Sequence, residues 1–313
     1  MIAARISDGA VAAADYPDPQ PGKGEVVVGV RAAGLNGADM HQLAGRYPAP
    51  PGSPPDIPGL ELAGEVVAVG ADAMRFELGA RVMGIVGGGA QAELTAVHER
   101  QLMAVPDSVD WPAAGGFPEC FTTAQDALFS QCELGPGERL LINGGAGGVG
   151  SAAIQLGALA GASVFATVRD ANLRDAVADL GATALAPDEF ADHGPFDVIL
   201  ELVGAPNLPG DLQALAPLGR IAVIGTGAGS HAELDLSVLM ARRARIHGST
   251  LRSRALEDKA AAARAVERHV LPALAAGKLR VPIAATFPLA DVAGAYERFA
   301  AGSKLGKVVL VIG

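Results

Sequence analysis

The pattern of apolar and polar positions changes character near Trp111. Before that residue, short apolar runs are separated by breaks rich in glycine and proline, which is typical of β-strands joined by loops. After it, apolar runs of about five residues alternate with longer helical stretches, which predicts strands separated by helices. The pattern therefore predicts a mostly β first part and an α/β second part.

The first part contains four segments with strand character and one segment that excludes regular structure. The expected strands are residues 25–32, 62–70, 81–84 and 92–97. Tyr47–Pro55 is too rich in proline for a helix or a central strand, so we expect an exposed loop there.

The second part predicts a doubly wound parallel sheet of six strands. The expected strands are residues 139–143, 163–168, 182–186, 197–201, 220–225 and 244–248. A helix is expected over 172–180, with Asp170 or Asn172 as its cap and Gly181 at its end. In such sheets, ligands bind at the carboxyl ends of the strands.

The C-terminal part is interpreted as a return to the β domain. We expect a long alanine-rich helix over about 255–276, a strand over 281–287, a helix over 289–301 and a final strand over 307–312.

The segment Leu140–Gly150 is the strongest candidate for a ligand site. An apolar strand runs into glycines, and residues 151–156 continue as a helix, an order that presents backbone N–H groups to a phosphate. The glycines at 145, 147 and 150 fit the dinucleotide fingerprint. With 41 glycines in the chain the spacing alone is weak, but a strand before, a helix after and a second strand about 20 residues on support it.

The end of the second parallel strand indicates which dinucleotide binds. An acidic residue there favours the ribose hydroxyls of NAD, whereas an arginine accommodates the 2′-phosphate of NADP. Arg169 follows the strand and Arg174 lies one turn into the next helix, which favours NADPH. Asp170 is the competing signal, unless it only caps the helix.

Composition excludes several classes of protein. A formal charge of −10 argues against a nucleic-acid partner. Two cysteines give no disulfide framework, and the N-terminus lacks a signal-peptide apolar region, so we expect a cytoplasmic protein. Residues 140–168 are uncharged and long enough for a membrane span, but their glycines and changing period fit a buried β-α-β unit better.

The six histidines lack metal-ligand spacing, and no Ser-His-Asp nucleophile site is recognisable. The chemistry is therefore expected to be the cofactor's, with the protein supplying position and polarity.

Several motifs in order along the whole chain point to one family. They are residues 33–39 (AGLNGAD), 45–47 (GRY), 57–66 (IPGLELAGEV), 117–124 (FPECFTTA), the glycine turn, 251–254 (LRSR), 287–289 (FPL) and 306–310 (GKVVL). The chain resembles the zinc-independent quinone oxidoreductase (zeta-crystallin-like) branch of the medium-chain dehydrogenase/reductase superfamily. The resemblance implies a GroES-like β domain over 1–120 and 252–313, a Rossmann domain over 121–251 with the cofactor in the cleft, and a homodimer through the edge of the sixth strand.

The resemblance also implies roles for individual residues. Zinc enzymes of the superfamily carry a ligand histidine where Leu60 stands, and their ligand cysteine before Asp39 is missing, so no metal is expected. Asn36 and Tyr47 would lie near the nicotinamide and the substrate, as catalytic candidates. The cofactor would be bound by Thr123, Asn143, Gly145, Ala146, Gly147, Gly148, Val149, Gly150, Arg169, Arg174, Gly225, Thr226, Leu251, Arg252, Ser253 and Lys307.

The sequence thus predicts hydride transfer from NADPH to a quinone, with an α,β-unsaturated carbonyl as the alternative acceptor. Asn36 and Tyr47 would position the carbonyl and stabilise developing negative charge. Water or Tyr47 would supply the proton. Two departures bear on this: Asn172 and Leu173 stand where some relatives have lysine, and Gln125 stands where some have an aromatic residue. A non-catalytic NADPH-binding protein with a redox-sensing or structural role is the rival hypothesis.

Overall fold

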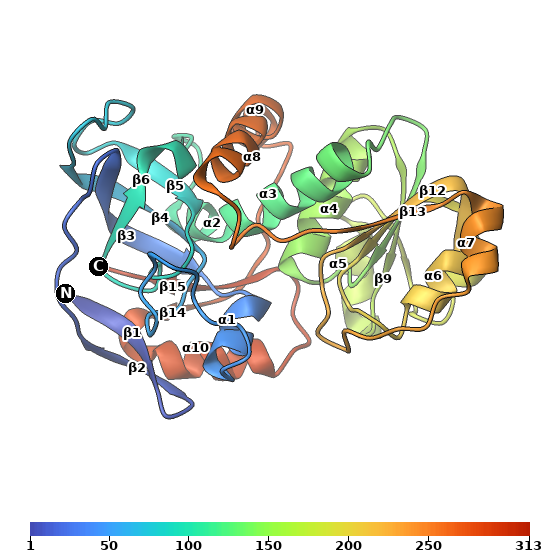
Figure 1. Cartoon of the computed structure of the whole chain (residues 1–313), viewed down its shortest axis with the longest axis horizontal. Helices are drawn as coiled ribbons and strands as arrows, with labels where there is room; N and C mark the ends of the chain where they lie inside the picture. The colour runs from blue at the N-terminus through green and yellow to red at the C-terminus, as the bar shows by residue number, and fades with distance from the viewer. The chain divides into compact units, whose positions relative to one another are not determined.

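The computed structural model describes all residues from Met1 to Gly313 and divides into two compact units. Unit 1 comprises Met1–Thr122, Leu251–Gly302 and Lys307–Gly313, and unit 2 comprises Thr123–Thr250 and Ser303–Gly306. In Figure 1, unit 1 carries both ends of the chain and unit 2 carries the green-to-orange middle of it.

Unit 1 is built around a mostly antiparallel sheet in the order β14-β15-β3-β4-β5-β7, with β6 also paired to β3 and a separate β1-β2 hairpin. Its strands are β1 (Ile2–Ser7), β2 (Ala10–Asp15), β3 (Glu25–Gly34), β4 (Glu61–Val69), β5 (Arg81–Ile85), β6 (Leu94–His98), β7 (Leu102–Ala104), β14 (Ile283–Pro288) and β15 (Lys307–Val311). Its helices are α1 (Gly37–Leu43), α2 (Trp111–Gly116), α8 (Leu256–His269), α9 (Leu271–Ala275) and α10 (Val292–Ala300).

The last strand of the chain pairs within the sheet of unit 1. β15 pairs antiparallel with β3 and parallel with β14, so the last strands extend a sheet that began near residue 25. Helix α10 packs on this sheet and places Val292, Ala295 and Tyr296 in the same apolar core as Val28 and Leu310.

Unit 2 is a six-stranded parallel sheet in the order β10-β9-β8-β11-β12-β13. This order reverses direction between β8 and β11, which is the doubly wound Rossmann arrangement predicted from the sequence. The strands are β8 (Arg139–Asn143), β9 (Ser163–Thr167), β10 (Thr183–Leu185), β11 (Phe196–Glu201), β12 (Leu215–Val223) and β13 (Arg245–Gly248). The helices are α3 (Pro118–Gln125), which the unit boundary divides, α4 (Gly148–Leu159), α5 (Arg174–Ala178), α6 (Leu208–Ala214) and α7 (Leu236–Arg242).

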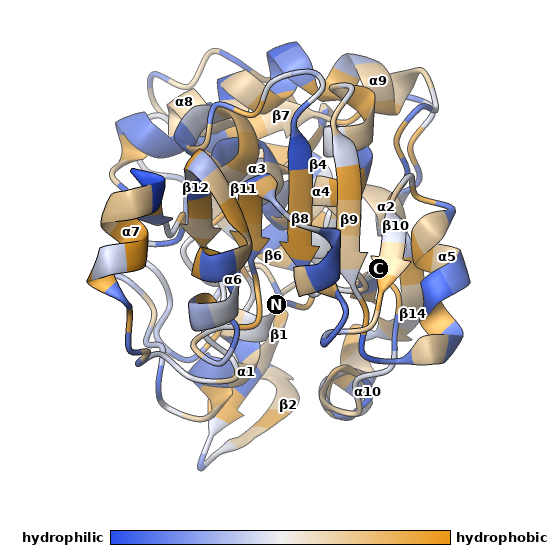
Figure 2. Ribbon diagram, turned by 90° about the vertical axis from the view of Figure 1, so that its right-hand side faces the viewer, coloured by the Kyte–Doolittle hydropathy of each residue, from blue (hydrophilic) through white to orange (hydrophobic).

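The central strands of unit 2 are apolar because helices cover the sheet, and Figure 2 shows β8 and β11 coloured as hydrophobic along most of their length. Leu140, Leu141 and Ile142 of β8 are completely buried. Helix α4 packs against β8 and β9, and its close approach is possible because Gly157 leaves room for the side chains of Leu140 and Val164.

Three helix predictions need correction. The helix expected over 255–276 is two helices, because Pro272 has no N–H to continue the hydrogen-bond ladder past Val270. The helix expected over 172–180 is a 3₁₀ turn followed by the short α5, and Asp170 rather than Asn172 caps it. Helix α4 begins at Gly148, three residues before the predicted start. No helix of the chain is long and apolar enough to cross a membrane.

Candidate functional site

The glycine turn of unit 2 connects β8 to α4 and is tied down at both ends. Gly145 N–H donates to the Thr167 carbonyl at 2.9 Å, and Gly144 N–H donates to the Thr167 hydroxyl at 3.2 Å. The Ala146 carbonyl accepts from Gly306 N–H at 2.9 Å. The first turn of α4 leaves its N–H groups without intrahelical acceptors, so Gly148, Val149 and Gly150 present backbone donors at the positive end of the helix.

The three glycines of the fingerprint are needed for different physical reasons. A Cβ at Gly150 would lie 2.3 Å from the Gly144 carbonyl, and one at Gly145 would lie 2.7 Å from the Ala166 methyl, so both glycines are required by packing. A Cβ at Gly147 would meet no atom nearer than 3.6 Å. Packing within the chain therefore does not require a glycine at position 147, whereas the close approach of a pyrophosphate to the backbone would.

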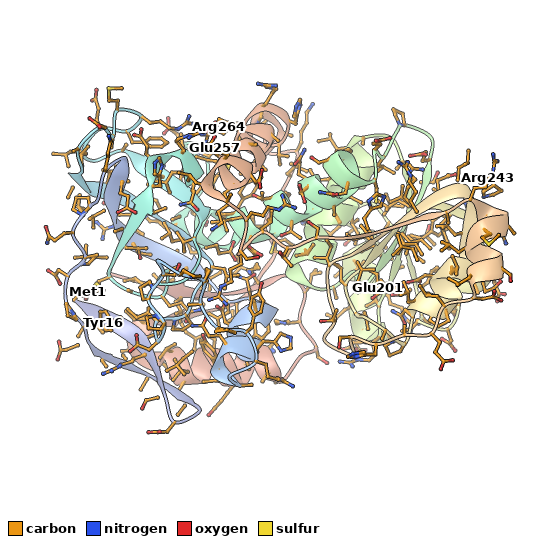
Figure 3. The ribbon with its side chains drawn as sticks, viewed as in Figure 1. Met1, Tyr16, Glu201, Arg243, Glu257 and Arg264 are labelled. Atoms are coloured by element: carbon orange, nitrogen blue, oxygen red, sulfur yellow. The ribbon has the colours of Figure 1, made fainter.

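Asn143, a predicted cofactor residue, is completely buried and bonded within unit 2. Its Nδ2 donates to Glu201 Oε2 and to Asp211 Oδ1, both at 2.8 Å, and its Oδ1 accepts from the Thr167 hydroxyl at 3.1 Å. Glu201, labelled in Figure 3, ends β11, and its Oε1 accepts from the N–H groups of Val203 and Gly204. Asn143 therefore supports the glycine turn by linking the ends of β8, β9 and β11 through hydrogen bonds.

Asp211 shares this network as a second fully buried carboxyl group. Burial, and next the charge of Glu201, raise the pKa of Asp211 to about 9. At neutral pH Asp211 is therefore protonated, which removes the repulsion that two adjacent buried carboxylates would suffer.

The end of β9 places one arginine against the strand and leaves another exposed. Arg174 Nε donates to the Val168 carbonyl at 3.3 Å, which holds its guanidinium beside the strand end. Arg169 is exposed to solvent. Asp170 Oδ1 accepts from Asn172 N–H at 3.0 Å as a helix cap, so one oxygen of the competing acidic residue is already occupied.

The remaining candidates of unit 2 lie at strand ends and on α3. Gly225 N–H donates to the Glu201 carbonyl at 3.1 Å, and Gly204 approaches Thr226 too closely for any side chain at position 204. The Thr123 hydroxyl is buried without a hydrogen-bond partner in the chain, and so is Gln125 Oε1. Such orphaned buried polar atoms suit a polar ligand.

Unit 1 contains a separate buried polar network around Lys307. Lys307 is 3% exposed, and its Nζ donates to Glu61 Oε1 at 2.6 Å, the Leu35 carbonyl at 2.7 Å and Asn36 Oδ1 at 2.7 Å. Asn36 Nδ2 in turn donates to Glu61 Oε1 at 2.9 Å and to the Gly34 carbonyl at 3.3 Å. The amide hydrogens of Asn36 are thus used within the chain, and its Oδ1 accepts from the Lys307 ammonium.

Asp39 is fully buried at the start of α1, next to this network. Its carboxylate accepts from Asn36 N–H at 2.8 Å and from Gly59 N–H at 3.0 Å. Burial raises the pKa of Asp39 to about 6, while the two backbone hydrogen bonds and Lys307 oppose the rise. Asp39 is therefore mainly ionised at neutral pH and fixes the loop that carries Gly59.

Arg252 holds the Tyr47 loop. The guanidinium donates to the Gly87 carbonyl at 2.7 Å, the Tyr47 carbonyl at 3.0 Å and Gln42 Oε1 at 2.6 Å, and it lies 4.9 Å from the centre of the Tyr47 ring. The Tyr47 side chain is half-buried, and burial raises the pKa of its phenol. The Tyr47 hydroxyl makes no hydrogen bond within the chain, so it can donate to a ligand.

The predicted residues thus fall into two groups. The glycine turn, Arg169, Arg174, Gly225 and Thr226 follow strand ends of unit 2, and Thr123 lies on α3 in the same unit. The other candidates belong to unit 1: Asn36, Tyr47, Leu251, Arg252, Ser253 and Lys307. Leu251 is buried against Ile85 and Ala262 and offers no polar group.

Sequence reasoning missed the buried acids Glu61, Glu201 and Asp211 and the partly exposed Glu119. A carboxylate within or beside an apolar strand, as in Leu60-Glu61-Leu62, could have signalled a buried partner. No group of three or more His, Cys, Asp or Glu side chains in the chain is arranged to hold a metal ion.

Comparisons with known proteins agree with this architecture. Residues 22–107 match the alcohol dehydrogenase GroES-like domain, and residues 174–310 match the zinc-binding dehydrogenase family. The chain is 32% identical over 309 residues to a quinone oxidoreductase of Pseudomonas aeruginosa, covering 95% of this chain and 94% of that protein. It is 30% identical over 314 residues to the human quinone oxidoreductase, covering 95% and 92%.

A solved structure gives the same result for the fold. An alcohol dehydrogenase superfamily protein from Novosphingobium aromaticivorans superimposes with a TM-score of 0.89 at 29% identity, covering 100% of both chains. The chain therefore belongs to the quinone oxidoreductase branch of the medium-chain dehydrogenase/reductase superfamily, and it is an oxidoreductase that uses a nicotinamide cofactor.

Proposed function

We propose that this enzyme transfers a hydride from NADPH to a quinone without a metal ion. The observation that carries the proposal is the cofactor cradle of unit 2, in which packing does not require the glycine at position 147 and Arg174 is held at the end of β9. The names of the relatives support the quinone as acceptor. They also argue against a non-catalytic role.

Each part of the cofactor would have a chemical partner in this cradle. Residues 146–150 would bind the pyrophosphate with backbone N–H groups and the positive end of α4. Arg169 and Arg174 would bind the 2′-phosphate, because a guanidinium donates paired hydrogen bonds to a phosphate. The unpartnered Thr123 hydroxyl would bond to the nicotinamide end, together with Gly225 and Thr226. The bound cofactor supplies the hydride.

The residues of unit 1 would bind and polarise the acceptor. The free Tyr47 hydroxyl donates to the acceptor carbonyl and stabilises the negative charge that develops there. Arg252 fixes the Tyr47 loop through three hydrogen bonds. Asn36 acts mainly by position, because Lys307 and Glu61 hold its side chain.

Metal independence is supported by the donor set of unit 1. Leucine at position 60 offers no ligand atom, and the Lys307 ammonium already neutralises Glu61 at 2.6 Å. Both oxygens of Asp39 accept backbone N–H groups. The residues that remain do not fit the three protein ligands of a catalytic zinc.

An α,β-unsaturated carbonyl is the alternative acceptor. Gln125 with its unpartnered Oε1 offers a polar atom in place of an aromatic ring that would stack on a quinone. We also propose a homodimer through β13, whose outer edge is unpaired within the chain, and a reducing cytoplasm, which suits the two free buried cysteines.

Acceptor panels test the proposal. NADPH oxidation is followed against a series of quinones and a series of enones, with and without a chelator, and NADH is run in parallel. We expect turnover of quinones, preference for NADPH and no effect of the chelator. Turnover of enones alone would establish the alternative acceptor, and loss of activity with chelator would contradict metal independence.

A further inference from the structure

Glu119, in the first turn of α3, is a carboxyl group that the network of unit 1 leaves without a hydrogen-bond donor. Its backbone N–H donates to Glu61 Oε2 at 2.8 Å, which fixes the residue beside the Lys307 network. Its Oε2 atom is buried and has no hydrogen-bond partner in the chain, although the residue as a whole is partly exposed. One side of the carboxyl group is therefore shielded by protein and the other is open.

The donors of the Lys307 network already bond to the other two carboxylates, Glu61 and Asp39. Glu61 accepts from the Lys307 ammonium, the Asn36 amide and the Glu119 backbone, and Asp39 accepts two backbone N–H groups. The Arg252 guanidinium donates its hydrogen bonds to two backbone carbonyls and to Gln42. An ionised Glu119 would thus be a half-shielded charge with no donor, which is unfavourable.

The electrostatic surroundings lead to the same protonation state. Burial first, and the Glu61 charge second, raise the pKa of Glu119 to about 8. The titratable groups that interact electrostatically with Glu119 are Glu61, Lys307, Asp39, Arg252, Lys259, Tyr47 and Cys120. At neutral pH Glu119 is therefore mainly a carboxylic acid, with a hydroxyl group that finds no acceptor within the chain.

We infer that Glu119 is a catalytic residue that donates a hydrogen bond to the acceptor carbonyl and then gives up its proton to the reduced acceptor. This inference rests on the proposed reductase function and names the proton source for it. A carbonyl oxygen is the acceptor that an unpaired carboxylic acid lacks, and Glu119 is fixed by the same Glu61 carboxylate that holds the side chain of the catalytic candidate Asn36. Rotation of the carboxyl group exchanges its shielded and open oxygens.

The atoms and electrons of the step balance. The hydride brings two electrons and forms a new bond to the acceptor, which becomes a hydroquinone anion or an enolate. The O–H bond of Glu119 breaks and its proton neutralises that anion. Glu119 is left as a carboxylate and takes a proton from water before the next turnover. A carboxylic acid with a pKa close to the working pH is suited to this exchange.

The kinetic test compares the wild type with Glu119→Gln, which keeps the shape of the side chain but has no acidic proton. For the wild type, kcat/KM should fall as pH rises through about 8, because the acid form is required. In the variant this alkaline limb should be absent, and kcat/KM at neutral pH should be about 100-fold lower. Glu65→Gln, which changes an exposed carboxylate paired with Arg31, is the matched control and should behave as the wild type. An unchanged alkaline limb in Glu119→Gln would overturn the inference.

A binding measurement separates this inference from the reductase proposal. In the complex with NADP⁺, which cannot turn over, quinone affinity should weaken above about pH 8 in the wild type and should be independent of pH in Glu119→Gln. Failure of every acceptor to react, with this binding dependence intact, would overturn the proposed function and keep Glu119 as a ligand donor. A binding dependence identical in both proteins would overturn the role of Glu119.

Discussion

Replacing Lys307 by methionine removes the one cation inside the polar network of unit 1. The Lys307 Nζ makes three contacts of 2.6 to 2.7 Å with Glu61, Leu35 and Asn36, and Glu61 is completely buried. Methionine fills a similar volume but leaves the Glu61 carboxylate without its counter-ion. Breaking one side of a buried ion pair costs about 3–5 kcal/mol, which is a large part of the ~5–15 kcal/mol that stabilises most proteins.

The single tryptophan allows the unfolding of unit 1 to be followed on its own. Trp111 begins α2 in unit 1, so its fluorescence during urea unfolding reports on unit 1 alone. The exposed Lys278 lies in the same unit, and Lys278→Met should change the free energy of unfolding by less than about 0.5 kcal/mol. Adding Glu61→Gln to Lys307→Met removes the unpaired charge and should restore more than half of the lost stability. A loss below about 1 kcal/mol that the added Glu61→Gln substitution does not change would refute the reasoning that the pair is structurally required.

Three further predictions concern unit 2. Gly147→Ala should weaken NADPH binding about tenfold or more without changing stability, which a titration with NADPH measures. Gly150→Ala should weaken NADPH binding and also lower the free energy of unfolding by about 1–3 kcal/mol, which hydrogen exchange of β8 measures. Because the pKa of Asp211 is raised to about 9, wild-type stability should fall as pH rises from about 4 through 9. Asp211→Asn should make this fall smaller and should raise the free energy of unfolding by about 1 kcal/mol at the alkaline end, as measured by urea unfolding followed by circular dichroism. Arg169→Ala or Arg174→Ala should each lower kcat/KM for NADPH about tenfold and leave that for NADH unchanged; equal losses with both cofactors would argue against a 2′-phosphate site.

The sequence was informative wherever a feature is local in the chain. The glycine turn could be predicted because strand, turn and helix follow one another within residues 139–159, and the parallel, doubly wound sheet could be predicted because six strands alternate with helices. The helix break at Pro272 could also have been inferred from the sequence, but the alanine-rich composition on either side of the proline suggested one continuous helix.

The buried networks could not be predicted, because their members are far apart in the chain. Lys307 meets Glu61 across nearly the whole sequence, and Asn143 meets Glu201 and Asp211 only through the pairing of β8 with β11. Family resemblance named Lys307 as a cofactor residue, whereas the structure shows its ammonium engaged by three acceptors of unit 1. Protonation states depend on these contacts, so they become visible only in three dimensions.

Metal-independent hydride transfer is tested by anaerobic titration of the enzyme with NADPH and a quinone in the presence of a chelator. We expect about one hydroquinone for each NADPH consumed, since a hydride carries both electrons in one step. We also expect Gly147→Ala to lower this activity through the apparent affinity for NADPH. NADPH binding without hydroquinone formation, or formation that stops when chelator is added, would contradict metal-independent hydride transfer.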